Sequence, residues 1–292
     1  MIEFEYLKAL PSAVELFKSL NKKETKAKLE MRTKRMLNFL ANGETKVGIF
    51  GAGGTGKSTF GKLLITKDPF LLSSEYDPDV ILNDDPIPGK ISSRIFVVPG
   101  QEAYVENIWP KAFDQLSKAR TLLVINVVAF GYHGFGFKSF STLPIFKENE
   151  GLPTKQIFEK YLEDRRGEEL KRMTSLCDEL KKLNRPLRLI TLVTKQDLWW
   201  HERQKCGEFY SAEYSEKIQQ VKVELDTKRV YFQHEFFSVS LVHSNFTTPA
   251  SELLCETSKG YDMQYHLGSI QNILNKFDDL LNDTAKGFVI RR

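Results

Sequence analysis

The chain has 292 residues, of which 41% are hydrophobic and 27% charged, which is the composition of an ordinary globular protein with a sizeable core. No stretch approaches the roughly 18 apolar residues that span a membrane, residues 1–20 lack a signal-peptide pattern, and the net charge of +4 does not by itself favour nucleic acid. Cys177, Cys206 and Cys255 lack the spacing of a disulfide framework or metal site, so a cytoplasmic protein is predicted.

Residues 1–44 are predicted to form a helical N-terminal extension. A short amphipathic run covers Ala13–Leu20, and a second helix covers Lys22–Leu40 and stops near Gly43. The second helix is rich in lysine and arginine, which we interpret as a solvated face beside the domain. Contact with an acidic partner, RNA or an anionic surface is the alternative.

Strands and helices alternate from residue 45 to about residue 245. Strands are predicted at Lys46–Phe50, Val80–Leu82, Ile91–Val98, Thr121–Phe130, Pro186–Thr194 and Glu235–Val242. Helices are predicted at Lys57–Ile65, Ala103–Ala119, Ile157–Leu183 and Glu208–Asp226, with a loop and a closing helix near Ser269–Leu281 in residues 246–292. The strands are mostly continuous apolar runs, which is typical of a sheet covered on both faces. The pattern predicts an α/β protein with a doubly wound, mostly parallel sheet flanked by helices.

The run VGIFGAGGTGKST at residues 47–59 is the most specific motif of the chain. A buried strand ends in a loop of the form Gly-x-x-x-x-Gly-Lys-Ser, whose backbone N–H groups can cradle phosphates, and a helix follows. Lys57 is expected to reach the β- and γ-phosphates and stabilise the transferring charge, and the Ser58 hydroxyl to bind Mg²⁺. The predicted phosphate-binding residues are Gly51, Gly53, Gly54, Thr55, Gly56, Lys57, Ser58 and Thr59.

A second motif, Thr194-Lys195-Gln196-Asp197, ends a predicted strand at the sheet edge where open α/β sheets bind ligands. The Asp197 carboxylate can accept hydrogen bonds from the N1–H and the exocyclic amine of guanine, a donor pair that adenine does not present. The Lys195 stem can lie over the flat base. The motif resembles the [N/T]-K-x-D guanine-specificity motif of GTPases, with Thr194 in the first position.

A third motif, VVPGQE at residues 97–102, resembles the D-x-x-G-Q switch II motif of Ras-like GTPases. Gly100 is expected to bring its backbone N–H to the γ-phosphate, and Gln101 to orient the attacking water. Val97 stands where that motif has an aspartate that holds Mg²⁺ through water, and an apolar side chain cannot take this role. Switch I should supply a threonine, but Thr66, Ser73 and Ser74 stand in no convincing setting.

In this order the motifs resemble the Ras-like P-loop GTPases of the translation-factor-related class. The switch II motif without its aspartate is most similar to that of bacterial gliding-motility and ADP-ribosylation-factor-like GTPases. The resemblance implies a G domain at residues 45–245 that binds GTP with Mg²⁺, hydrolyses it to GDP and phosphate, and switches a protein effector or activating partner. It also implies that Lys57 and Gln101 are catalytic and that Ser240 and Leu241 contact the base.

The interval between Gly100 and Asp197 is longer than a compact core of this class needs. The excess falls at about residues 131–183, which we interpret as an insertion that packs against its own domain. Alternatively, its aromatic residues and His133 cover the site or bind a partner. Three arginines are conceivable arginine fingers but are expected to be solvated surface residues: Arg94, Arg165 and Arg166.

Two other functions stay open. Without the aspartate at position 97, the chain can be a nucleotide-binding scaffold with little or no hydrolysis. A P-loop ATPase or small-molecule kinase would share the phosphate loop but make Asp197 irrelevant to base choice. No lipid anchor is expected, because Ile2 is not glycine and no cysteine stands near Arg292. Nucleic acid is not indicated, and membership of a complex stays open.

Overall fold

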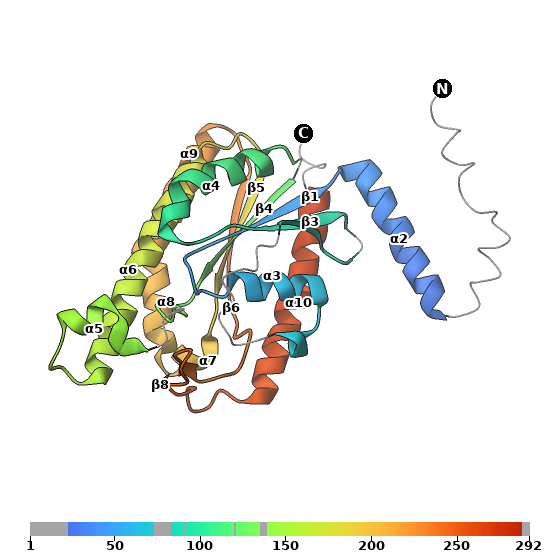
Figure 1. The fold of residues 1–292 in the computed structure, drawn as a ribbon. Coiled ribbons are helices and arrows are strands. Elements are labelled where there is room, and N and C mark those ends of the chain that lie inside the picture. The colour runs from blue at the N-terminus through green and yellow to red at the C-terminus, as the bar shows by residue number, and fades with distance from the viewer. Residues whose placement is uncertain (1–22, 73–82, 90, 120, 135–138, 288–292) are drawn as a thin grey trace, which may run out of the picture.

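A computed structural model describes residues 23–72, 83–89, 91–119, 121–134 and 139–287 of the chain (Figure 1). Its centre is a six-stranded sheet in the order β2-β3-β1-β4-β5-β6. The strands span Thr45–Phe50 (β1), Asn83–Pro86 (β2), Ser93–Val97 (β3), Thr121–Val128 (β4), Leu187–Val193 (β5) and Phe232–Ser238 (β6). Strand β2 pairs antiparallel with β3 at one edge, and every other neighbouring pair is parallel.

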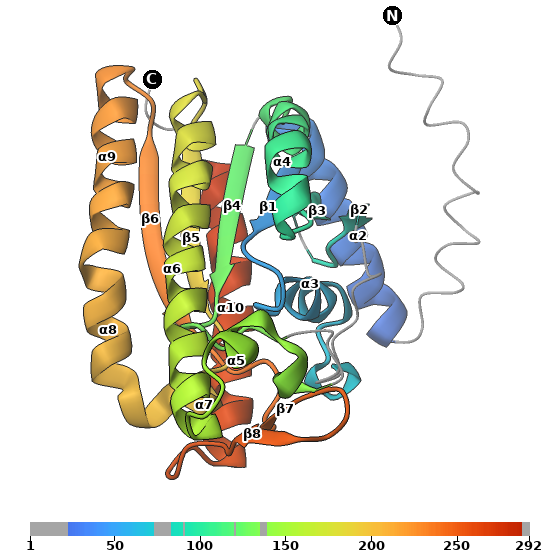
Figure 2. The same ribbon diagram turned by 60° about the vertical axis from the view of Figure 1, so that its left-hand side comes forward.

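Helices flank this sheet on both faces. They span Lys23–Asn42 (α2), Lys57–Thr66 (α3), Glu102–Ser117 (α4), Pro144–Glu148 (α5), Thr154–Lys181 (α6), Gln196–Trp199 (α7), Arg203–Ser211 (α8), Glu213–Thr227 (α9) and Met263–Gly287 (α10). A two-stranded sheet joins Phe246–Thr247 (β7) and Leu253–Cys255 (β8). Figure 2 shows α4 and α6 in front of the sheet, α8 and α9 at the left beside β6, and α10 behind the sheet. Helix α9 shares a hydrophobic core with α4 and α6. The predicted α/β class with a mostly parallel, helix-flanked sheet is confirmed.

Side chains of the central strands alternate between two hydrophobic cores. In β4, Leu122 and Val124 join the core under α4, α6 and α9, whereas Leu123 and Ile125 join the core under α3 and α10. Successive strand residues point to opposite faces, so a strand covered on both faces is apolar throughout. All seven residues of β5 are buried for the same reason.

The strand order reverses direction beside β1. The chain leaves β1 through α3 toward β2 and β3, and then crosses through α4 to β4 on the other side of β1. The loops after β1 and β4 therefore leave the sheet toward opposite faces, so the carboxyl ends of these two strands form the switch point of the sheet. Ligands of open α/β sheets bind at such a switch point.

Several predicted boundaries differ from the structure. The helix predicted at Glu208–Asp226 is two helices, because the backbone turns at Ala212, whose φ and ψ are −87° and −122°. The last strand lies earlier than predicted because β6 is an edge strand, half-exposed, and therefore tolerates polar side chains in its first half. The closing helix begins before and ends after the predicted range. Ala13–Leu20 and Val80–Leu82 lie outside the described residues.

Helix α2 lies beside the rest of the chain, away from the sheet (Figure 1). It exposes apolar as well as basic side chains, among them Met36, Leu37 and Leu40. In the part of the chain that the structure describes, no helix combines the length and the apolar character needed to cross a membrane.

Candidate functional site

The loop between β1 and α3 follows a backbone path that requires glycine at its closest contacts. Gly51, Gly54 and Gly56 have positive φ angles of 134°, 74° and 92°. A Cβ atom would lie 2.1 Å from the Val127 carbonyl oxygen at Gly51 and 2.0 Å from the Gly134 carbonyl oxygen at Gly54. The Gly134 N–H also donates to the Gly54 carbonyl at 2.9 Å. The phosphate loop is thus packed against the end of β4 and the segment after it.

Gly100 approaches the same loop from β3. A Cβ atom at this position would lie 2.1 Å from the Gly51 carbonyl oxygen and 2.5 Å from the Lys57 Nζ atom. The turn before Gly100 is anchored on α4, because the buried Trp109 donates its Nε1–H to the Pro99 carbonyl at 3.2 Å. The motif at residues 97–102 is therefore in contact with the glycine-rich loop of the motif at residues 47–59.

Thr194 joins the phosphate loop to the end of β5. Its hydroxyl donates to the Thr55 carbonyl at 2.6 Å and lies 3.1 Å from the Val128 carbonyl oxygen. Leu241, just after β6, reaches the loop as well, since its Cδ1 atom lies 3.4 Å from where Gly56 would carry a Cβ. Segments at the ends of β4, β5 and β6 therefore meet the loop after β1.

Asp197 and Ser240 lie in contact, as the two predicted base-binding segments require. The Asp197 side chain is only 1% exposed, and it accepts hydrogen bonds from the Ser240 hydroxyl at 2.5 Å and the Ser244 N–H at 3.1 Å. Burial raises the pKa of Asp197, and these two hydrogen bonds oppose the rise. The carboxylate is thus held in one orientation but is covered by residues 240–244.

Lys195 has a strained backbone and a half-buried side chain. Its φ and ψ of 55° and 36° are left-handed, which is uncommon for a residue with a long side chain. Its Nζ atom lies 4.9 Å from the centre of the Phe246 ring. Burial lowers the pKa of Lys195 to about 8, although Asp197 and Glu169 oppose this. A base above Lys195 would share this surface with Phe246.

Lys57 is buried at the start of α3, with 7% of its surface exposed. Its ammonium group donates to the Ala52 carbonyl at 2.5 Å. Burial and, after it, the Arg172 charge lower the pKa of Lys57 to about 7, although the Glu168 charge opposes both. Among the described residues, the buried ammonium group is therefore bonded to a neutral carbonyl and to no carboxylate.

The predicted Mg²⁺ ligand, Ser58, lies half-buried in the first turn of α3 next to Thr59. Val97 is 4% exposed and belongs to the core under α3 and α10, so this position offers no side-chain oxygen to a metal. Among the described residues, no group of three or more His, Cys, Asp or Glu side chains is suited to a metal. A cation here would need phosphate oxygens and water beside Ser58, which is how Mg²⁺ commonly binds.

The remaining predicted residues, Gln101 and the switch I candidates, lie at different distances along the chain from the glycine-rich loop. Gln101 directly precedes α4 and is exposed, one residue after the contact between Gly100 and the phosphate loop. Thr66 lies in the last turn of α3 and donates to the Lys62 carbonyl, at the opposite end of that helix from the loop. Ser73 and Ser74 fall outside the described residues.

Glu169 of α6 is an important residue that the sequence analysis did not identify. Its buried carboxylate accepts hydrogen bonds from the Ala129 N–H (2.8 Å), the Gly131 N–H (3.2 Å), the His133 Nε2–H (2.8 Å) and the Tyr210 hydroxyl (2.6 Å). Burial would raise the pKa of Glu169, but the hydrogen bonds and the charge of His133 outweigh it, and the pKa is lowered. This carboxylate fixes the segment after β4 that contacts the phosphate loop.

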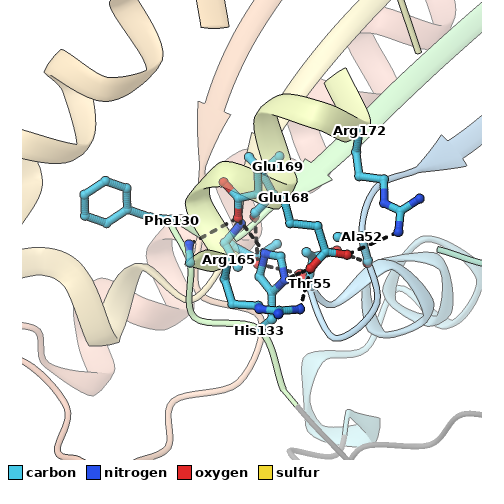
Figure 3. Close-up of polar contacts among 12 residues, drawn as sticks. Ala52, Thr55, Phe130, His133, Arg165, Glu168, Glu169 and Arg172 are labelled. Atoms are coloured by element: carbon cyan, nitrogen blue, oxygen red, sulfur yellow. Dashed lines mark hydrogen bonds and ion pairs between the residues drawn. The ribbon is translucent and has the colours of Figure 1, made fainter. Parts of the chain in front are cut away.

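The next charged residues of α6 face the same loop. Figure 3 shows Glu168 and Arg172 beside Ala52, with Arg165 one turn earlier on the helix. Glu168 accepts from Arg165 Nη1 at 2.5 Å and from Arg172 Nη2 at 3.3 Å. The spacing 165, 168, 169, 172 follows one helix face and was the sequence signal that could have indicated this cluster.

Described residues of the segment 131–183, predicted to be an insertion, pack against one another and into the core. Phe140 is fully buried against Phe158 and Tyr161, and His133 is 2% exposed and bonded to Glu169. The expectation that Arg166 is a solvated surface residue is wrong, because its guanidinium lies buried 4.9 Å from the Phe130 ring centre. A cation on an aromatic face remains stable away from water, which composition alone does not reveal.

Comparison with protein-family models and with curated proteins finds no match to this chain.

Gly100→Ala tests the close packing of the phosphate loop. The new methyl group has no room against Gly51 and Lys57, so the variant should lose about 1–3 kcal/mol of unfolding free energy, measured by urea denaturation. Gly53→Ala is the matched control, because nothing lies within 4 Å of its Cβ position, and its loss should stay within about 0.5 kcal/mol. Equal losses in the two variants would contradict this packing.

The pKa of Lys57 makes stability depend on pH. Between pH 7 and 10.5 the unfolded chain holds the proton that folded Lys57 has lost, so the contribution of Lys57 to stability should rise with pH in this window. The buried thiols of Cys177 and Cys206, whose pKa values burial raises, oppose this rise near pH 9, so the measured quantity is the difference in slope between wild type and the lysine variants. The rise from Lys57 is up to about 1.4 kcal/mol per pH unit, measured by urea denaturation from pH 7.5 to 9.5. Lys57→Met should reduce the slope, leaving the part due to Lys195, whereas Lys62→Met on the exposed side of α3 should keep it. An unchanged slope in Lys57→Met would refute the desolvation of Lys57.

Proposed function

We propose that this protein binds a guanine nucleoside triphosphate with Mg²⁺, hydrolyses it slowly to the diphosphate and phosphate, and acts as a nucleotide-dependent switch for a protein partner. The convergence of three separate sequence motifs supports this function. The hydrogen bond from the Thr194 hydroxyl to the Thr55 carbonyl joins the base motif to the phosphate loop, and Gly100 contacts the loop from the other side. Chance motifs would have no reason to meet at the switch point of the sheet.

The phosphate-binding part of the proposal rests on the start of α3. The backbone N–H groups of the glycine-rich loop and of the first helical turn offer donors for phosphate oxygens. Lys57, whose acceptor among the described residues is the neutral Ala52 carbonyl, would gain a charged acceptor. Ser58 supplies a hydroxyl oxygen for Mg²⁺, whose chemistry is to neutralise charge between the β- and γ-phosphates.

Base selection is assigned to Asp197. Each of its carboxylate oxygens accepts one hydrogen bond from Ser240 or Ser244 and keeps a further lone pair for the guanine N1–H and amine. Because the side chain is 1% exposed, residues 240–244 must shift for a base to reach it. The hydrogen bond from Ser240 keeps the carboxylate oriented while they do so.

Slow hydrolysis follows from what surrounds Gln101. Its position beside Gly100 suits a residue that orients water near the γ-phosphate. The buried Val97, however, cannot hold the metal through water as an aspartate would. The same burial supports the second candidate, a nucleotide-binding scaffold that does not hydrolyse.

Base competition tests the assignment of Asp197. Wild-type protein should prefer guanosine triphosphate over adenosine triphosphate by at least about tenfold in Kd, because adenine leaves the buried carboxylate without its two donors. Asp197→Asn should shift the preference toward xanthosine triphosphate, whose base presents an acceptor where guanine has an amine. Wild-type preference for adenosine triphosphate would refute the guanine assignment and favour an ATPase or kinase.

Single-turnover hydrolysis separates the switch from the scaffold. Gln101→Leu should lower the rate about 10²-fold or more, as expected for loss of a group that orients the nucleophile, while leaving the Kd for nucleotide nearly unchanged. Lys57→Ala provides the background rate, since it loses the phosphate contact itself. Wild-type hydrolysis no faster than Lys57→Ala, with tight nucleotide binding, would establish the scaffold instead.

A further inference from the structure

Helix α6 places a cationic cluster against the phosphate loop. Arg172 and Glu168 lie close enough to Lys57 for their charges to shift its pKa. Glu168 is bonded to both Arg165 and Arg172, and its Oε2 atom lies 3.9 Å from the His133 Nδ1 atom (Figure 3). One carboxylate is therefore shared by two arginines, close to Ala52, whose carbonyl accepts from Lys57 (Figure 3).

The positive charge of this cluster is not fully neutralised. Arg165 has a second carboxylate partner, Asp164, but Lys57 is bonded to a neutral carbonyl. The neighbouring Glu169 is already engaged by four donors and cannot serve the arginines. A partly buried cluster with surplus positive charge beside a helix N-terminus is suited to an anion with several oxygens.

Arg172 provides the second, independent observation. Its side chain is 8% exposed, so it has lost most of its contact with water. Its Nε–H group nevertheless has no hydrogen-bond partner among the described residues, although buried N–H groups are normally paired. The adjacent Nη2 makes only a long bond of 3.3 Å to Glu168. The guanidinium beside Glu168 and Ala52 thus keeps an unused hydrogen-bond donor (Figure 3).

We propose that Arg172, assisted by Arg165, binds the terminal phosphate of the nucleotide from within the same chain, and that Glu168 holds this place until the phosphate displaces it. This inference rests on the proposed function, because it concerns the same phosphate site. Phosphate and carboxylate compete for the same planar donors, and a phosphate brings more charge and more acceptor oxygens. Its negative charge also repels Glu168.

The exchange connects the nucleotide to helix α6. Glu168 and Glu169 are consecutive residues, and Glu169 holds the segment after β4 through three hydrogen bonds. Release of Glu168 therefore changes the charge balance on the helix turn that anchors this segment. A diphosphate, which lacks the terminal group, leaves the arginines bonded to Glu168.

Calorimetric titration of the full chain tests the exchange with three probes: inorganic tripolyphosphate, a non-hydrolysable guanosine triphosphate analogue, and guanosine diphosphate. The titrations are made first with a chelator and then with Mg²⁺. Arg172→Gln should weaken the binding of tripolyphosphate and of the triphosphate analogue about tenfold or more, with a small effect on the binding of the diphosphate. Glu168→Gln should instead strengthen the binding of the same two ligands several-fold, because the competing carboxylate is gone. Lys171→Gln is the matched control, an equal charge change at an exposed position of α6.

The exchange is supported if Glu168→Gln increases and Arg172→Gln decreases the affinity for tripolyphosphate and the triphosphate analogue. Weaker triphosphate binding in both variants would overturn the exchange, since the pair would then only support the helix. If Glu168→Gln weakened binding only in the presence of Mg²⁺, Glu168 would instead be a metal ligand. Equal affinities of Arg172→Gln and Lys171→Gln would overturn it as well. If Arg172→Gln does not fold, the sign of Glu168→Gln decides alone.

The two proposals fail in distinguishable ways. Tripolyphosphate binding that depends on Arg172, without preference for guanine, leaves the exchange standing and removes the guanine assignment. Guanine-specific binding with no effect of either α6 variant removes only the exchange. A wild-type chain that binds none of the three probes overturns both.

Discussion

Backbone contacts that leave no room for a side chain hold the phosphate loop in place. Gly51 packs on the end of β4, Gly54 on the segment after β4, and Gly100 on Gly51 itself. Close backbone approach of this kind is possible only for glycine, so the loop has one conformation compatible with its neighbours. Everything else at the site depends on this fit, because it positions Lys57 at the start of α3 and the Thr55 carbonyl under Thr194.

This tight packing has an electrostatic consequence. Because the loop packs on β4, on the segment after β4 and on Gly100, Lys57 loses water and its pKa falls to about 7. The nearby helix α6 carries part of its charge with little solvent as well, since the Arg172 side chain is 8% exposed. The two glutamates of α6 have different partners. Glu169 accepts from backbone, imidazole and phenol donors, whereas Glu168 accepts from two arginines. A site that binds a highly charged ligand is expected to be arranged in this way, with cations desolvated in advance and held by a replaceable carboxylate.

The fold and part of the site could be predicted because they depend on local pattern. Apolar runs such as Thr121–Phe130 marked the central strands, and the three motifs were correctly expected to follow strands of one sheet. The errors fell where tertiary context overrides the pattern. The last strand lies at the edge of the sheet and carries polar residues, so its range was predicted too late in the chain. Arg166 was predicted to be a surface residue, but its guanidinium is buried against the Phe130 ring.

The sequence alone determined the α/β class, the phosphate-loop motif and the candidates Lys57, Ser58, Gly100 and Asp197, because glycine positions and apolar runs act within a few residues of chain. Only the tertiary structure brought in Glu168, Glu169 and Arg172, which stand more than a hundred residues after the loop in the printed sequence. Their role depends on which face of α6 turns toward β1 and β4 and on the burial that follows. Distance, desolvation and charge balance arise only when distant segments pack together, and no local pattern encodes them.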